Sequence, residues 1–143
     1  MAAQHNISIT PTTFNAAVDF SACANTLYRA VRAGSVAGEV ALANGASNPY
    51  AFGVLQNTPS PGQGAALVLL GPTKMAGRTT ATCTLKFGRL LVVASDGFFE
   101  PPSVPPGSPI SAMWLGPNFT TAGGSIVGEG MFYGLTACAV SAC

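Results

Sequence analysis

The chain has 143 residues and a formal net charge of +1, and only 8% of its residues are charged, about a third of the share in an ordinary soluble domain. Its hydrophobic content of 48% excludes an intrinsically disordered chain, and its length is that of one domain. The six basic side chains are scattered singly, which argues against direct nucleic-acid binding, because displacing counterions from phosphates needs clustered Lys and Arg.

The apolar stretches do not predict a membrane span. No charge lies between Glu39 and Lys74, but Asn-Gly, Asn-Pro and Pro-Gly turn signals interrupt that stretch, and a spanning helix needs about 20 consecutive apolar residues. The first eight residues lack the basic and apolar regions of a secretory signal, so we expect synthesis in a reducing cytoplasm.

The four cysteines give no sign of a metal site, since they form no CxxC pair and His5 is the single histidine. We therefore expect no metal and no cofactor. Small buried thiols are the simplest interpretation of Cys23, Cys83, Cys138 and Cys143, and a disulfide formed late between Cys138 and Cys143 is the alternative.

Residues 1–20 are expected to form an extended N-terminal arm ahead of a single β domain at 21–143. The arm is polar at first, from Ser8 to Thr13. A short helix is the alternative for its second part, because residues 14, 17, 18, 21 and 22 are apolar or small and recur at helical spacing.

From Thr26 onward, short runs of strand-forming residues alternate with turn signals such as Asn44-Gly45 and Asp96-Gly97, which predicts an all-β fold. The expected strands are 26–33, 36–43, 51–56, 65–70, 79–87, 89–94, 110–115 and 125–133.

The segment 79–87 has the clearest strand pattern. Its odd-numbered positions from 81 to 87 are apolar and its even-numbered positions are threonine or lysine, a period of two that places Cys83 in the core. The continuous apolar run 65–70 suits a strand that is covered on both faces. Five prolines within 101–109 predict a stiff surface loop that cannot pair into a sheet.

Groups that could perform catalysis are scarce, which predicts that the protein is not an enzyme. His5 lies in the expected arm, where nothing would orient it. Asp96 and Glu100 could in principle form an acid/base pair, but Asp96 lies in a Ser-Asp-Gly turn, where an Asp side chain normally caps backbone donors. No catalytic residue is therefore assigned. A surface with so little charge either relies on Ser, Thr, Asn and Gln for solubility or is covered in part by partners. We expect both here, because the chain is rich in Ser, Thr and Asn and has more apolar runs than a core of this size needs, which indicates a component of an assembly.

Residues 52–74 read Phe-Gly-Val-Leu-Gln-Asn-Thr-Pro-Ser-Pro-Gly-Gln-Gly-Ala-Ala-Leu-Val-Leu-Leu-Gly-Pro-Thr-Lys. This segment resembles the signature of small capsid decoration (cement) proteins of tailed phages, in which a Gly-Val-Leu-Gln-Asn strand precedes a Pro-x-x-Gly turn and a second apolar strand. Residues 28–31 and 88–97 fit the same pattern, so the resemblance covers roughly residues 25–100. Its motif residues here are Gly53, Val54, Leu55, Gln56, Asn57, Pro59, Gly62, Gly71 and Lys74.

The resemblance implies a small β-barrel or β-sandwich that forms a homotrimer and binds the major capsid protein on the outer surface of an icosahedral head. Such a protein is made in the host cytoplasm, becomes part of the virion and stabilises the capsid by clamping neighbouring subunits. The candidate partner contacts are Ile7, Ile9 and Phe14 near the N-terminus, and Trp114 and Phe119 in the later part of the chain. The alternatives are another virion structural part (a head fibre base, a tail-tube subunit or a minor coat protein) and a barrel that binds a small ligand.

Overall fold

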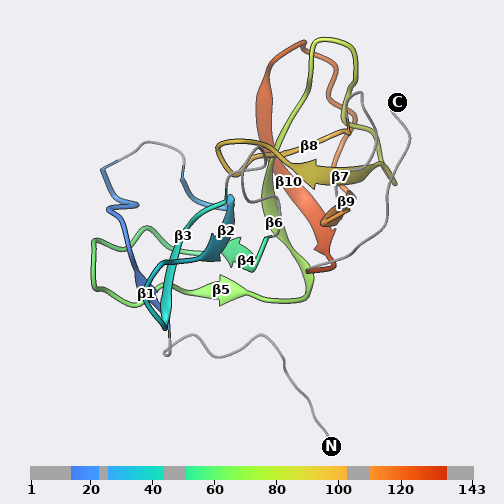
Figure 1. The fold of residues 1–143 in the computed structure, drawn as a ribbon. Coiled ribbons are helices and arrows are strands. Elements are labelled where there is room, and N and C mark those ends of the chain that lie inside the picture. The colour runs from blue at the N-terminus through green and yellow to red at the C-terminus, as the bar shows by residue number, and fades with distance from the viewer. Residues whose placement is uncertain (1–13, 23–25, 44–50, 103–109, 135–143) are drawn as a thin grey trace, which may run out of the picture.

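The computed structural model describes residues 14–22, 26–43, 51–102 and 110–134. The described chain contains ten strands and no helix, and the strands form two five-stranded sheets, of which the second closes into a barrel (Figure 1). The predicted all-β class with a small barrel is therefore confirmed. Residues 1–13 of the expected arm and residues 103–109 of the proline-rich loop lie outside the described residues.

The first sheet has the order β1-β3-β2-β4-β5, with β1 parallel to β3 and the other neighbours antiparallel. An antiparallel bridge between Asn15 and Gly64 brings the segment before β5 beside β1, so the sheet curls back on itself. The strands are β1 Asn15–Ala16, β2 Ala30–Ala33, β3 Glu39–Leu42, β4 Gly53–Leu55 and β5 Leu67–Val68.

The barrel has the order β10-β6-β8-β7-β9 and is closed by pairing between β10 and β9. Its longest pair is β6 with β10, which are antiparallel from Gly71 opposite Phe132 to Arg78 opposite Ser125. The strands are β6 Gly71–Arg78, β7 Leu90–Val93, β8 Phe99–Glu100, β9 Ala112–Trp114 and β10 Ser125–Phe132.

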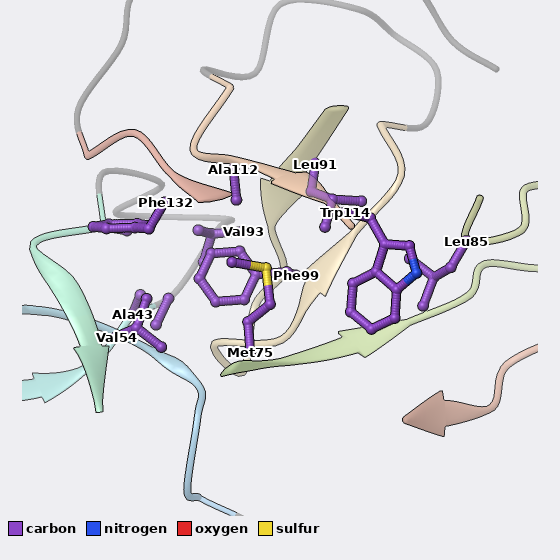
Figure 2. Close-up of a cluster of buried hydrophobic side chains, with 12 residues drawn as sticks. Ala43, Val54, Met75, Leu85, Leu91, Val93, Phe99, Ala112, Trp114 and Phe132 are labelled. Carbon is purple, nitrogen blue, oxygen red and sulfur yellow. The ribbon is translucent and has the colours of Figure 1, made fainter. Parts of the chain in front are cut away.

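The two sheets share buried apolar surface. A smaller cluster fills the curl of the first sheet around Phe20, Leu55 and Leu67. The larger cluster fills the barrel around Trp114 and also takes in Val54 of β4, as Figure 2 shows. Burial of this apolar surface, the main favourable term in folding, therefore links the two sheets as well as the strands within each one.

Backbone hydrogen bonds also join the sheets where the chain passes through residues 28–30. Ala76 N–H of β6 donates to the carbonyl of Tyr28 at 2.8 Å, and Ala30 N–H of β2 donates to the carbonyl of Gly97 at 2.8 Å. Gly97 lies in the turn between β7 and β8, where its φ of 85° agrees with the Asp-Gly hairpin signal.

The segment before Thr26 belongs to the first sheet as far as the structure describes it. Ala16 lies in β1, and both Ala16 and Phe20 are fully buried, so these two side chains attach the segment 14–20 to the core of the first sheet. The helix considered for residues 14–22 is wrong, because β1 and turns occupy them. The reason is tertiary, since pairing with β3 supplies backbone partners that a short isolated helix would lack.

The segment 79–87 is not a strand, and this prediction is wrong. Its single bridge joins Leu85 to Phe119, and only part of the expected inward face is buried: Cys83 and Leu85 are enclosed, whereas Phe87 is 72% exposed. Of the two enclosed side chains, Leu85 belongs to the buried cluster of the barrel and reaches it from a loop. Each of the other seven expected segments contains one observed strand.

Cys83 is buried, as predicted, but it is not a free thiol, because the structure has it disulfide-bonded. The interpretation of Cys83 as an inert thiol is therefore wrong. Cys23, Cys138 and Cys143 lie outside the described residues, and so does the alternative pairing of Cys138 with Cys143.

Candidate functional site

The segment that contains the sequence motif forms β4, β5 and the first half of β6. Gly53, Val54 and Leu55 are the three residues of β4, and all are buried. Gly71 is the first residue of β6, and Lys74 is exposed in the same strand. The motif thus runs from the inside of the first sheet to the surface of the barrel.

Asn57 fastens the turn that follows β4. Its Nδ2 donates to the carbonyl of Gly64 at 3.0 Å, and its Oδ1 accepts from Ala66 N–H at 2.9 Å. Within the loop between these partners, the carbonyl of Pro59 accepts a bond from Phe20 N–H, and Gly62 has a φ of 80° that favours glycine. These motif residues therefore shape the hairpin between β4 and β5.

Gln56 connects the same hairpin to β6. Its Nε2 donates to the carbonyl of Val54 at 3.1 Å and to Thr73 Oγ1 at 3.0 Å. The half-buried Gln56 side chain thus bridges the first sheet and the barrel.

Lys74 lies opposite Glu129 in the register of β6 and β10, and both side chains are exposed. They border a shallow depression of about 410 Å³ that is lined also by Leu115, Pro117 and Val127. Lys74 is the motif residue best placed to meet a partner, because the rest of the motif is mostly buried or engaged within the fold.

The predicted partner contacts differ in exposure. Phe14 is half-buried and meets Phe52 edge-on, with ring centroids 5.0 Å apart. Phe119 is half-buried against the barrel core. Trp114 is fully buried, and its Nε1 donates to the carbonyl of Pro117 at 2.8 Å, so it cannot touch a partner on the outer surface. Ile7 and Ile9 lie outside the described residues.

The carboxylates of Asp96 and Glu100 lie on either side of one guanidinium. Arg78 Nη1 is 2.7 Å from Asp96 Oδ2, and Arg78 Nε is 3.2 Å from Glu100 Oε2. Burial by itself would raise the pKa of Asp96, but the hydrogen bond and positive charge of Arg78 outweigh it and lower that pKa. Asp96 in the turn and Glu100 at the end of β8 are thus both held in ion pairs with Arg78. A general acid would instead need a raised pKa to hold its proton.

Phe98 contacts two arginines, one of which is Arg78. The guanidinium carbons of Arg29 and Arg78 are 4.0 and 4.7 Å from its ring centroid, which is cation–π distance. Phe98 also lines a cavity of about 310 Å³ with Leu27, Tyr28 and Ile126, where the two sheets meet. Tyr28 has a φ of 65°, a left-handed conformation that is uncommon for a residue with a side chain.

Within the described ranges, no three His, Cys, Asp or Glu side chains gather in a way that could hold a metal ion. His5, the histidine considered for catalysis, lies outside them. Over those same ranges the structure contains no helix with the length and apolar character needed to cross a membrane.

Large apolar side chains are exposed on both sheets of the described chain. Phe87 is the most exposed at 72%, and Val127, at 49%, lies on β10 between the two cavities. The others are Val18, Val36, Phe52 and Leu70. Sequence reasoning missed Phe87 because it assigned this residue to the inner face of a strand. The signal that could have found it is Gly88, because a glycine directly after Phe87 favours a turn there, which would end the strand pattern at that point.

No protein-family model, curated protein or solved structure matches the chain.

Proposed function

We propose that the chain is a decoration protein of a tailed-phage head, which binds the outer surface of the icosahedral capsid as a homotrimer. In this role it contacts the major capsid protein, clamps neighbouring subunits together and becomes part of the virion after synthesis in the host cytoplasm. It acts by adhesion and transforms no molecule. The proposal starts from the resemblance of residues 52–74 to that family.

The observation that supports it best is the exposed apolar surface. Phe87, Val36 and Leu70 are each more than half exposed, and they come from a turn in the barrel, the loop between β2 and β3, and the turn between β5 and β6. With only 8% charged residues, the chain has little charged surface to offset them. Exposed apolar side chains on a surface with so little charge suit an assembly in which partners cover several faces.

The engaged carboxylates support adhesion over catalysis. Asp96 and Glu100 are both bound by Arg78, so both carboxylates are engaged in ion pairs within the fold. To clamp a capsid, a trimer needs only interfaces of sufficient area and simultaneous binding to several coat-protein subunits. An interface of about 1,600 Å² holds at nM to μM strength, and three linked sites raise the effective affinity about 10²- to 10⁴-fold.

The direct test is binding to heads assembled from the major coat protein of the same genome and lacking any decoration protein. We expect the recombinant chain to sediment with these heads at a fixed ratio, to add density on their outer face in electron micrographs, and to raise the temperature at which they open. The chain alone and heads alone are the controls. A chain that stays in the supernatant would contradict the proposal, and density confined to the tail or portal would favour another virion structural part.

A second candidate, binding of a small apolar ligand, is favoured by the cavity beside Tyr28 and Phe98. Its volume of about 310 Å³ lies at the lower end for ligand pockets, and its lining is largely apolar with two aromatic rings. Titration with 1-anilinonaphthalene-8-sulfonate separates the two functions. Saturable binding to a monomer that is lost in Phe98→Ala would support the ligand-binding function.

A further inference from the structure

The strand β5 has one open edge in the part of the chain that the structure describes. It is the last strand in the order of the first sheet, and within the described ranges β4 is the strand that pairs with it (Figure 1). An unpaired edge presents a row of N–H and carbonyl groups that can template a further strand, and native proteins cover or otherwise protect such edges. The open edge of β5 can therefore take another strand.

The pairing of β4 with β5 shows which backbone groups face this edge. Gln56 N–H donates to the carbonyl of Ala66 at 2.8 Å, so the groups of Ala66 face β4. Because backbone groups alternate between the two edges of an antiparallel strand, Leu67, and Leu69 after it, direct theirs to the open side. Leu67 is only 4% exposed, and buried backbone groups in proteins are normally paired. The open edge is thus a place where hydrogen-bond partners are expected.

The chain enters the first sheet at the beginning of this same edge. Ala65 N–H donates to the carbonyl of Phe14 at 3.0 Å, beside the antiparallel bridge between Asn15 and Gly64. Phe14 is the first residue that the structure describes. Since the two segments are antiparallel, the residues before Phe14 would continue alongside the residues after Ala65, which lead into β5.

The bridge also fixes the register of such a continuation. Asn15 and Gly64 form a non-hydrogen-bonded pair, because the bonds on either side of the bridge are made by their neighbours. Pairs of this kind recur at every second residue, so Pro11 would lie opposite Val68 in another one. Proline has no N–H, and in this position it would not need one, whereas a shift by one residue would place it where β5 requires a donor.

The composition of the preceding segment suits an edge strand in this register. Residues 7–13 read Ile-Ser-Ile-Thr-Pro-Thr-Thr, and most of them are β-branched, which favours strands. Positions 10 and 12 would supply the hydrogen bonds at the open edge. Ile9 would lie beside Leu70, which is 56% exposed in the described chain, so the same pairing would cover an exposed apolar side chain.

From this register we infer that residues 9–13 form a strand antiparallel to β5 and continuous with β1, which closes the open edge within the same molecule. A second copy of the chain is a less direct source, because the carbonyl of Phe14 already holds the start of this edge through Ala65. The inference does not depend on the proposed function. It assigns Ile9 to the fold, and not to a contact with a partner.

Disulfide trapping in the full chain tests the register. Pro11→Cys combined with Val68→Cys is expected to form a bond within one molecule, because Cβ atoms in a non-hydrogen-bonded pair lie about 4.5–5.5 Å apart, near the reach of a disulfide. Thr12→Cys combined with Val68→Cys is the matched control, since successive side chains of a strand point to opposite faces, and it is expected to be trapped about 10-fold less. Mass spectrometry of digested protein identifies the bond at positions 11 and 68 apart from those of the native cysteines.

Equal trapping of the two double variants, or no bond at positions 11 and 68, would overturn the inference. A bond between these positions that forms only between different molecules would overturn it as well, because it would assign the edge to a second copy.

Amide hydrogen exchange tests the same pairing without introduced cysteines. Thr12→Pro removes a donor at a hydrogen-bonded position and is expected to speed exchange of the Leu67 N–H about 10-fold or more, whereas Thr13→Pro, at a non-hydrogen-bonded position, is expected to have little effect. The Val68 N–H, which faces β4, is the internal reference in both variants. Equal exchange of the Leu67 N–H in the parent chain and in both variants would overturn the inference.

Discussion

Gly128 of β10 lies directly against the indole of Trp114. A Cβ built on Gly128 would be 2.6 Å from Cη2 and 2.7 Å from Cζ2 of the ring, closer than carbon atoms approach in folded proteins. Gly77 of β6 faces the same ring, with a built Cβ 2.7 Å from Cζ3. Two glycines thus leave room for the Trp114 ring in the barrel interior, and Figure 2 shows Trp114 among the other side chains of this cluster.

Gly128→Ala is expected to lower the free energy of unfolding by about 1–3 kcal/mol, because the added methyl group overpacks the barrel. Urea unfolding followed by fluorescence of Trp114, the single tryptophan, measures it. Gly64→Ala is the matched control, since a Cβ at Gly64 meets nothing within 4 Å. Equal stability of the two variants would contradict the packing described for Trp114.

Asn57→Ala is expected to lower the free energy of unfolding by about 1–2 kcal/mol, because it removes both bonds that fasten the β4–β5 hairpin and leaves a carbonyl and an N–H unpaired. Gln63→Ala, which removes the single bond that Ser60 N–H donates to Oε1 of the exposed Gln63 side chain, provides a graded comparison and should cost about 0.5 kcal/mol. If the two variants cost the same, Asn57 does not have the structural role inferred from its contacts.

Acid is expected to weaken the fold through Asp96. Since the pKa of Asp96 is lower in the folded chain than in the unfolded chain, its contribution is complete above the unfolded value of about 4 and disappears as the pH falls through the folded value. Asp96→Asn should therefore be less stable than the parent chain at neutral pH, by about 0.5–1 kcal/mol for a partly exposed pair, and the difference should vanish in acid.

Unfolding at a series of pH values checks this, and Asp19→Asn is a comparison that measures the separate contribution of Asp19. A hydrogen bond from the Ser21 hydroxyl lowers the pKa of Asp19 too, so this exposed residue contributes to acid sensitivity in the same direction. A stability difference between the parent chain and Asp96→Asn that persists unchanged at low pH would rule out the ion pair with Arg78 as its origin.

Phe98→Leu is expected to lower the free energy of unfolding by about 0.5–1.5 kcal/mol, because it keeps most of the apolar volume but removes the ring over which Arg29 and Arg78 lie. Thermal unfolding measures the effect. Phe52→Leu is the comparison, since Phe52 is an exposed ring that meets Phe14 and not a cation. An equal or smaller loss in Phe98→Leu would show that the cation–π contacts add no stability.

Local pattern predicted most of the strands but misassigned the segments around β6. The β6 sequence, Gly-Pro-Thr-Lys-Met-Ala-Gly-Arg, has little β propensity, and it forms a strand because β10 pairs with all of it. Residues 79–87 have the better alternation and stay in a loop, because no strand lies along them beyond the bridge at Leu85. The exposed position of Phe87 follows from the same misassignment.

The motif hairpin was located by its sequence, whereas its contacts were not foreseeable. Turn residues such as Pro59 and Gly62 predict that the chain reverses direction. The hydrogen bonds that join Asn57 to Gly64 and Ala66, however, depend on how the hairpin closes. Likewise Trp114 was expected at a partner surface, and it is buried because the barrel closes around it.

The amino-acid sequence by itself determined the all-β class, the positions of most turns and the low charge of the surface, since these follow from local backbone preference and composition. The tertiary structure decided which strands pair and which rings are enclosed. Strand pairing and burial depend on residues that are distant in sequence, such as Arg78 and Ser125 at one end of the β6–β10 pair. A local sequence pattern does not identify which distant residues will pair.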